Sequence, residues 1–211
     1  SDGAGAAATR NAAENGTAVT TVTATDVDAA TTLTYSISGG ADAAKFAINS
    51  STGVLTFVSA PDFEVPTDIG SNNVYDVTVQ VSDGAFTDTQ GIAVTVTNVN
   101  ESPVITSDGG GAGAAVNVAE NQTAVTTVTS SDVDGGGPLY TISGGADAAL
   151  FAIASATGAL SFAVAPDYEA PADTGADNVY DITVQVSDGN GGTDTQAISV
   201  TVTAVNDNAP V

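Results

Sequence analysis

The sequence predicts an all-β protein made of two tandem seven-stranded Greek-key β-sandwiches. Three observations predict this fold. Apolar residues recur at every second position in short runs, which is the period of a half-buried strand. Gly, Asn, Asp and Pro separate these runs, and no stretch has a convincing helical period. One module of about a hundred residues also occurs twice, and roughly seven short strands in each copy are typical of an antiparallel sandwich.

The internal repeat sets the organisation of the chain. The segment AENGTAVTTVTATDVD at 13–28 recurs as AENQTAVTTVTSSDVD at 119–134. Further along, NVYDVTVQVSDG at 73–84 recurs as NVYDITVQVSDG at 178–189. The offset is 106 residues for the first pair and 105 for the second, so one residue is lost between them. Similarity at a nearly constant spacing indicates one structural unit per copy.

The boundary between the two copies is expected near Pro103. We therefore expect a first domain over 1–102 and a second over 103–211, with no long flexible linker between them. A Gly- and Ala-rich stretch at 107–115 leads into the second copy.

The strands of the first copy are expected in a regular series, which the second copy should repeat: 17–24, 33–37, 46–48, 54–58, 76–82 and 92–97. The alternation is clearest in the last two, where Val77 and Val79, then Ile92 and Val94, are separated by polar residues. The segment ADAAKF at 41–46 is expected to form a single helical turn.

Composition limits both the core and the class of partner. Hydrophobic residues make up 42% of the chain, but with six Phe, five Tyr and no Trp the core must be thin. Two basic residues stand against 25 acidic ones, for a net charge of −23. Such a charge excludes a surface that binds the phosphate backbone of nucleic acids and disfavours binding to an anionic membrane. The natural partner of so acidic a chain is a cation.

Several ordinary stabilising devices are absent from the sequence. The chain has no Cys and no Met, so it has no disulfide framework and no thiol chemistry. Small domains without disulfides need another form of stabilisation, and a bound metal is one.

The sequence contains no run of 18 apolar residues, so we expect no membrane insertion. Residues 1–15 lack the pattern of a signal peptide, so we expect a piece of a longer protein.

The acidic residues recur at equivalent points of both copies, next to the ends of expected strands. Asp132 and Asp134, like Asp62 and Glu64, are two residues apart, so in extended chain both side chains leave the same face. Two such charges about 5 Å apart repel by roughly 3 kcal/mol at an effective dielectric of about 20. Several converging carboxylates therefore require a divalent ion, and Ca²⁺ suits oxygen donors in irregular geometry better than Mg²⁺ or Zn²⁺.

The sequence resembles the cadherin repeat over essentially all of its length. The motifs that carry the resemblance are AEN (13–15), PDFE (61–64), NVNES (98–102), DVD (132–134) and SDG (187–189), in that family's order. In such proteins Ca²⁺ ions lie at each junction between repeats. The resemblance therefore implies an ion site shared by the end of one repeat, the linker and the start of the next.

The resemblance implies a ligand set at the junction: Glu14, Asp62 and Glu64 from the first repeat, Asn100 (through its carbonyl), Glu101 and Ser102 from the linker, and Asp132, Asp134 and Asp188 from the second repeat. It implies a half-site at the far end of the second repeat, composed of Glu120, Asp167, Glu169, Asn206, Asp207 and Asn208. By the same logic Asp26, Asp28 and Asp83 would face a repeat that precedes this chain.

This sequence departs from the family pattern in its linkers. Asn98 and Ala204 stand where the family has an Asp, which weakens any ion that depends on that carboxylate. Ser102 replaces an amide, and Glu101 is one methylene longer than the usual Asp. The identity of the ion is therefore better determined than the number of ions.

Simpler interpretations of the same motifs exist. Asp83 and Asp188 each precede a Gly and are also typical of hairpin turns. An EF-hand beginning at Asp132 is excluded, because its twelfth position is Ser143 and flanking helices are absent from the pattern.

Paired carboxylates also serve glycosidases, but such sites add aromatic platforms, and this chain has no Trp, His or Cys. We therefore expect no enzymatic activity. The predicted function is that of a calcium-binding structural and adhesive segment of a secreted or cell-surface protein, in which Ca²⁺ makes the tandem repeats rigid. Its partners would be Ca²⁺, neighbouring repeats of the same chain, and a cell-surface protein or polysaccharide. The alternative is a calcium-dependent carbohydrate-binding module.

Overall fold

The computed structural model describes residues 5–28 and 32–206. The chain forms two compact units, Ser1–Val99 and Asn100–Val211. The sequence places the boundary after Ser102, whereas the contacts place it after Val99. The difference has a local cause, because Asn100 and Glu101 hydrogen-bond to side chains of the second unit.

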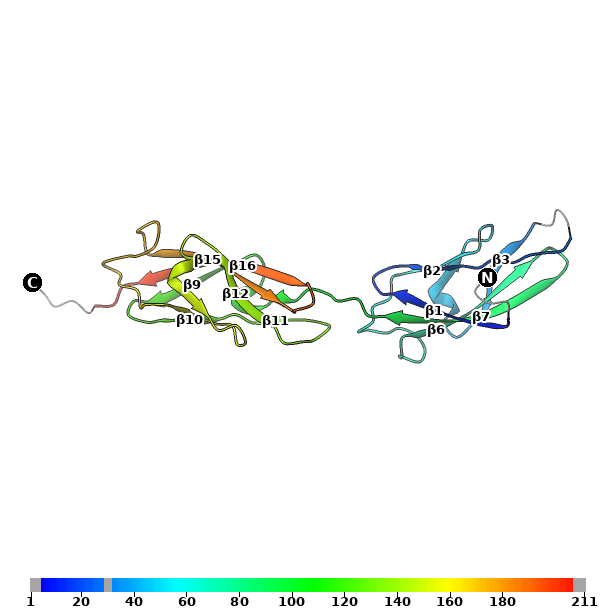
Figure 1. Ribbon diagram of the computed structural model, residues 1–211, viewed down its shortest axis with the longest axis horizontal. Helices are drawn as coiled ribbons and strands as arrows, with labels where there is room; N and C mark the ends of the chain where they lie inside the picture. The colour runs from blue at the N-terminus through cyan, green and yellow to red at the C-terminus, as the bar shows by residue number, and fades with distance from the viewer. Residues whose placement is uncertain (1–4, 29–31, 207–211) are drawn as a thin grey trace, which may run out of the picture. The chain divides into compact units, whose positions relative to one another are not determined.

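Unit 1 is a sandwich of two sheets (Figure 1). The first sheet has the order β1 (Ala7–Ala13), β7 (Thr87–Thr97), β6 (Val74–Ser82) and β3 (Thr34–Gly39). The second has the order β2 (Ala18–Thr21), β5 (Val54–Phe57) and β4 (Phe46–Ile48), and the turn η1 (Ala43–Lys45) precedes β4. Strand β1 runs parallel to β7, and all the other pairs are antiparallel.

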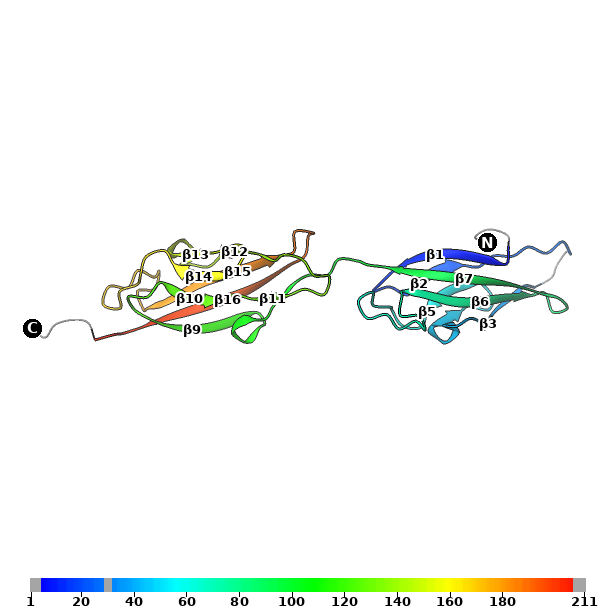
Figure 2. The ribbon, with the colours of Figure 1, turned by 90° about the horizontal axis from the view of Figure 1, so that it is seen from below.

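Unit 2 repeats this topology (Figure 2). Its first sheet has the order β12 (Leu139–Gly144), β15 (Val179–Ser187), β16 (Thr193–Thr203) and β9 (Gly113–Ala119). Its second has the order β10 (Ala124–Thr127), β14 (Ala159–Phe162) and β13 (Phe151–Ile153), preceded by η3 (Ala148–Leu150). An additional ribbon pairs β8 (Val104–Ile105) with β11 (Ser130–Ser131), and η2 (Ser107–Gly109) follows β8.

The all-β sandwich prediction is confirmed, and the expected turn at 41–46 is present as η1. The expected strand series omits β1 and β9, because both are rich in Ala, which has a weak preference for strands. Pairing with a long neighbour, rather than local preference, places them in the sheet. The small ribbon of β8 and β11 is also absent from the predicted series.

A cluster of three aromatic rings fills the centre of each sandwich. In unit 1, Phe57 lies 4.7 Å from Phe46 and 5.3 Å from Tyr75 between ring centroids, and Tyr75 is 1% exposed. The second contact is edge-to-face, the geometry that aromatic pairs favour. Unit 2 has the same cluster at the equivalent positions, Phe151, Phe162 and Tyr180. Val, Ile and Leu provide most of the remaining buried side chains of this thin core.

The parallel pairing determines where the acidic residues lie. Strand β1 pairs with β7 as far as Ala13 opposite Thr97, so the next residue, Glu14, begins where the last strand of the unit ends. The Glu14 N–H continues the ladder by donating to the Thr97 carbonyl at 3.1 Å. In unit 2, Glu120 donates to Thr203 at 3.0 Å in the same way.

Candidate metal centres

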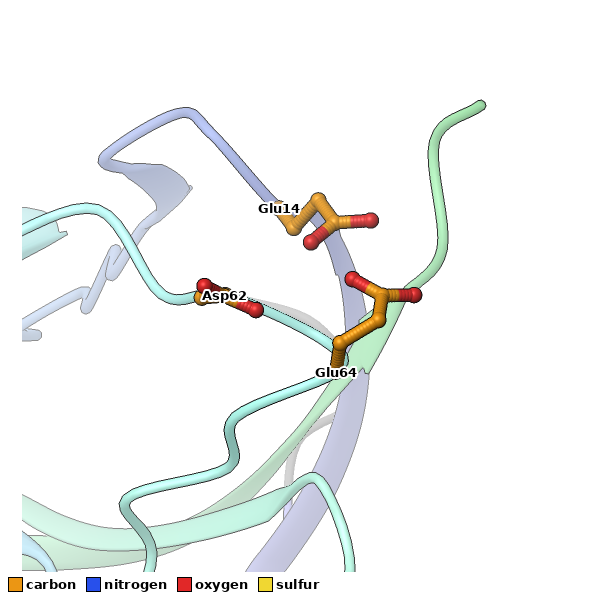
Figure 3. Close-up of side chains that lie close together, drawn as sticks. All are labelled: Glu14, Asp62 and Glu64. Atoms are coloured by element: carbon orange, nitrogen blue, oxygen red, sulfur yellow. The ribbon is translucent and has the colours of Figure 1, made fainter. Parts of the chain in front are cut away.

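Three carboxylates converge at the end of unit 1 where its last strand leaves the sandwich. Figure 3 shows Glu14, Asp62 and Glu64 pointing toward one another, the first from the end of β1 and the others from the loop after β5. Each offers one oxygen, and these oxygens all lie within 4.8 Å of one another. Three of the residues predicted to bind metal are therefore brought together.

Glu14 is the buried member of this group, at 3% exposure. Its Oε2 accepts a hydrogen bond from the Phe63 N–H at 2.6 Å, and its Oε1 accepts one from the Val99 N–H at 2.7 Å. Hydrogen bonds to a charged acceptor are among the stronger ones. The carboxylate is therefore fixed between the loop that carries Asp62 and Glu64 and the end of the unit.

The two other carboxylates are more accessible but are also held in place. Asp62 Oδ1 accepts from the Val65 N–H at 2.9 Å, and Glu64 Oε1 accepts from the Asn98 side-chain amide at 2.9 Å. Ca²⁺ bonds to oxygen at about 2.3 to 2.6 Å, so two ligands of one ion lie up to about 5 Å apart. The spacing in this group fits a shared calcium ion.

Unit 2 carries the same arrangement at its own end. Glu120 is 2% exposed, and its Oε2 and Oε1 accept from the N–H groups of Tyr168 and Val205 at 2.9 and 2.6 Å. With Asp167 and Glu169 it again offers oxygens within 4.8 Å of one another. The same geometry occurs in both units, so the repeated acidic motifs occupy equivalent positions in the two sandwiches.

A second set of oxygen donors lies at the start of unit 2. The Asn100 side-chain amide donates to Asp188 Oδ2 at 2.7 Å, and the Glu101 N–H donates to Asp134 Oδ2 at 2.6 Å. The Asp134 N–H in turn donates to Asp132 Oδ1 at 3.1 Å. Asp132 and Asp188 both line a small hollow of about 80 Å³. The D-x-D motif, the late Asp and the linker residues Asn100 and Glu101 thus meet within one unit.

The Asp188 carboxylate is stabilised in its charged form. The hydrogen bond from the Asn100 side chain is the main cause of the lowered pKa of Asp188. Burial acts in the opposite direction and raises the pKa, while the N–H groups of Asn190 and Gly192 lower it further. Asp188 therefore caps its own turn and also holds the linker. The turn interpretation of its motif is confirmed, and its role as a metal ligand stays a prediction.

Gly192 is a part of this arrangement that sequence reasoning missed. A Cβ atom at this position would lie 2.3 Å from Asp188 Oδ2, 2.9 Å from Ser102 Cα and 3.0 Å from the Glu101 carbonyl oxygen. Only glycine lets the linker lie so close to this turn. The signal in the sequence is the longer turn NGG, where the first repeat has AF.

The remaining predicted residues lie in the linker, at the end of unit 2 and at the start of unit 1. Ser102 is exposed, as is Asn206, while Asp207 and Asn208 lie outside the described residues. At the start of unit 1, Asp83 Oδ1 accepts from the N–H groups of Phe86 and Ala85, which lower its pKa.

Sequence reasoning also missed a group of buried aspartates that hold loops in place. Asp42 accepts from the N–H groups of Ile69 and Asp76 at 2.8 and 2.9 Å, and Asp68 accepts from those of Asn72 and Asn73 at 3.1 and 3.0 Å. Their equivalents in unit 2 are Asp147 and Asp173. Their recurrence in both copies was available in the sequence, but repetition alone does not separate a structural carboxylate from a ligand.

Comparison with protein families gives one match for each unit. Residues 6–100 match the family model described as Cadherin domain, and residues 100–201 match the one described as Bacterial Ig domain. The strand order is the same in both units, so the two descriptions apply to copies of one module. No helix within the described residues is long and apolar enough to cross a membrane.

Curated relatives are long proteins of which this chain matches a small part. Human Protocadherin Fat 1 is 31% identical over 195 residues, which is 88% of this chain and 4% of that protein. Mouse Cadherin EGF LAG seven-pass G-type receptor 2 is 34% identical over 204 residues, which is 92% of this chain and 6% of that protein.

Solved structures show the same fold. Human Protocadherin-24 EC1-2 aligns with a TM-score of 0.61 at 21% identity and covers 93% of this chain and 95% of that one. Mouse Cadherin-23 EC22-24 aligns with a TM-score of 0.56 at 21% identity and covers 96% of this chain and 64% of that one. At this level of identity the likeness concerns the fold alone.

Proposed function

Because the chain is a tandem pair of cadherin-like repeats, we propose that it is a calcium-binding structural and adhesive segment of an extracellular protein. The observation that carries this proposal is the twofold occurrence of a buried glutamate fixed by two backbone N–H groups beside two accessible carboxylates. The proposed role is mechanical and not enzymatic. Its partners are Ca²⁺, adjoining repeats and a surface protein or polysaccharide.

The donor chemistry supports calcium as the ion. The groups consist of carboxylates that the backbone already orients, and the chain has no His or Cys with which to hold a softer metal. Converging charges that are costly without an ion become ligands when one binds. For sites with the affinity of extracellular modules, about 0.1 to 1 mM, millimolar calcium fills them.

Covalent connectivity supports a role at the junction. The Glu14 group is fixed by Val99, the last residue of unit 1, and the Asp134 and Asp188 group is fixed by Asn100 and Glu101, the first residues of unit 2. We propose that Glu14, Asp62, Glu64, Asn100, Glu101, Ser102, Asp132, Asp134 and Asp188 hold shared ions, which restrict motion about the linker. In this proposal Glu120, Asp167 and Glu169 serve a further repeat, together with Asn206, Asp207 and Asn208.

A double-mutant cycle in calorimetric calcium titrations tests whether the ions are shared. Asp134→Asn and Glu64→Gln should each weaken calcium binding, and their effects should be strongly non-additive because they act on the same site. The matched control pairs Asp134→Asn with Glu169→Gln, whose effects should simply add. Additive effects in both cycles would reject a shared site. Saturable binding of glycans that chelation abolishes would instead support the carbohydrate-binding alternative.

A further inference from the structure

An asparagine holds the loop that carries the two accessible carboxylates of each acidic group. In unit 1, the Asn73 side-chain amide donates to the Phe63 carbonyl at 2.8 Å. The N–H of the same Phe63 donates to Glu14 Oε2 at 2.6 Å. The peptide groups on both sides of Phe63 are therefore fixed, and Phe63 lies between Asp62 and Glu64 in the chain.

Unit 2 contains the same contacts at the equivalent residues. The Asn178 amide donates to the Tyr168 carbonyl at 3.0 Å, and the Tyr168 N–H donates to Glu120 Oε2 at 2.9 Å. The residue just before the asparagine differs between the copies, since it is Asn72 in unit 1 and Asp177 in unit 2. The asparagine and its contacts are thus present in both copies although the neighbouring residue changes.

The backbone of each asparagine is tied to the sheet of its sandwich. In unit 1, the Val96 N–H of β7 donates to the Asn73 carbonyl at 2.8 Å, and the Asn73 N–H donates to Asp68 Oδ1 at 3.0 Å. In unit 2, the Val202 N–H of β16 donates to the Asn178 carbonyl at 2.9 Å. The amide therefore connects the acidic loop to the last strand of the unit.

Two features show why this position requires an asparagine. Its φ is 61° in unit 1 and 65° in unit 2, a left-handed conformation that glycine adopts freely and that Asn adopts more readily than most other residues. Glycine, however, has no amide. The Oδ1 atoms of Asn73 and Asn178 are buried and have no hydrogen-bond partner among the described residues, which is unfavourable. Both copies nevertheless keep the bond from Nδ2 to the loop carbonyl.

We propose that Asn73 and Asn178 are positioning residues that set the calcium affinity of the acidic group in their own unit. This inference rests on the proposed calcium binding. Each amide holds the two accessible carboxylates beside the buried glutamate before an ion arrives. Without the amide, ion binding would have to order the loop, and the free energy of that ordering would be lost from the affinity. Replacing residues that hydrogen-bond around metal ligands typically weakens metal binding by about 10- to 100-fold.

The test is a calcium titration of Asn73→Gly and Asn178→Gly followed by NMR. Glycine keeps the left-handed backbone conformation and removes the amide. The Phe63 and Tyr168 backbone amide signals report the two acidic groups separately, because each N–H donates to the buried glutamate of its own unit.

The matched control is Asn72→Gly, the same substitution one residue earlier. The exposed Asn72 side chain accepts the Val74 N–H at 3.0 Å. Urea unfolding of each variant in chelator and in calcium separates a loss of stability from a loss of affinity. A purely structural role would lower the unfolding free energy equally in both conditions, whereas a positioning role would also reduce the gain that calcium produces.

We expect Asn73→Gly to move the midpoint of the Phe63 titration to at least about 10-fold higher calcium and to leave that of Tyr168 unchanged. Asn178→Gly should do the reverse, and Asn72→Gly should move neither midpoint. If the wild-type signals respond to calcium but a folded asparagine variant keeps its midpoint, this inference alone is rejected. If the wild-type signals do not respond to calcium, the proposed function is rejected and this inference with it.

Discussion

Glu14 and Glu120 occupy equivalent positions, and each is the buried, fixed carboxylate of the acidic group in its unit. Each carboxylate is almost fully buried, and burial of a charge is costly unless hydrogen bonds compensate it. Here two backbone N–H groups supply that compensation, and they come from segments far apart in the sequence. The same residue therefore joins the loop after the second sheet to the end of the last strand and presents a fixed charge.

Substitution of Glu14 by Gln should destabilise unit 1 by about 1 to 3 kcal/mol, because an NH₂ group would face the N–H of either Phe63 or Val99 and leave a buried donor without an acceptor. Chemical denaturation in chelator measures this loss. The exposed Asp62→Asn is the control, and it should change the unfolding free energy by no more than about 0.5 kcal/mol. Equal losses in the two variants would contradict the role assigned to the buried glutamate.

Asp173 predicts a dependence of stability on pH. Burial by itself would raise the pKa of Asp173, but the N–H groups of Asp177 and Asn178 outweigh it and hold the pKa below its ordinary value of 3.8. A group with a depressed pKa stabilises the folded state above its unfolded pKa, and this contribution is lost as the pH falls through the folded pKa. Urea midpoints measured from about pH 5 down to about pH 2 should therefore fall more for the wild type than for Asp173→Asn. Parallel curves for the two proteins would contradict this.

At the scale of the element, hydrogen bonds and close packing hold the linker against the start of unit 2, including the turn after β15. Asn100 and Glu101 bond to Asp188 and Asp134, and the close approach depends on Gly192. The second unit therefore holds the first residues of the linker before any ion binds.

Gly192→Ala should displace the linker, because a methyl group would overlap Asp188 Oδ2 and crowd the Ser102 backbone. We expect loss of the Asn100–Asp188 hydrogen bond, seen as a shift of the Asn100 side-chain amide in NMR spectra, and a destabilisation of about 1 to 3 kcal/mol. Gly137→Ala is the control, since a Cβ at Gly137 meets nothing within 4 Å. An unchanged Asn100 signal in Gly192→Ala would show that the turn tolerates a side chain.

Predictability from sequence differs between kinds of element. Strands β6 and β7 alternate apolar and polar residues over a long run, so local pattern alone identifies them. Strand β1 has little local preference, and its place depends on a partner more than 70 residues away. The acidic groups were predictable because their carboxylates recur in closely spaced pairs, such as Asp62 and Glu64. The buried loop aspartates recur too, but only their contacts with distant backbone N–H groups identify their role.

At the scale of the whole molecule, net charge dominates. The chain carries 25 acidic and two basic residues, so charge repulsion opposes the compact state wherever carboxylates gather. Bound Ca²⁺ would remove repulsion and add ligand bonds at the same positions.

Calcium should raise the unfolding free energy by about 2.7 kcal/mol per site when its concentration is a hundredfold above the dissociation constant. Differential scanning calorimetry in calcium and in chelator measures this change. Magnesium is the control, and it should stabilise the chain less because it requires tighter octahedral coordination. Equal stabilisation by both ions would indicate nonspecific charge neutralisation.

Salt should narrow the difference between the calcium-bound and calcium-free forms. Raising NaCl from about 0.05 to about 0.5 M shortens the screening length and reduces repulsion among exposed carboxylates. In chelator, the unfolding temperature should therefore rise with salt, while in calcium it should change little. A fall with salt in chelator would mean that attraction outweighs repulsion on this surface.

The parallel pairing of β1 with β7, and of β9 with β16, determines how each unit responds to traction. In unit 1 the first described strand is β1 and the chain leaves along β7; in unit 2 the short strand β8 precedes β9, and the chain leaves along β16. Because the two run in the same direction, tension on the ends slides one strand along the other. A whole row of interstrand hydrogen bonds is then loaded at once in shear and is not opened one bond at a time.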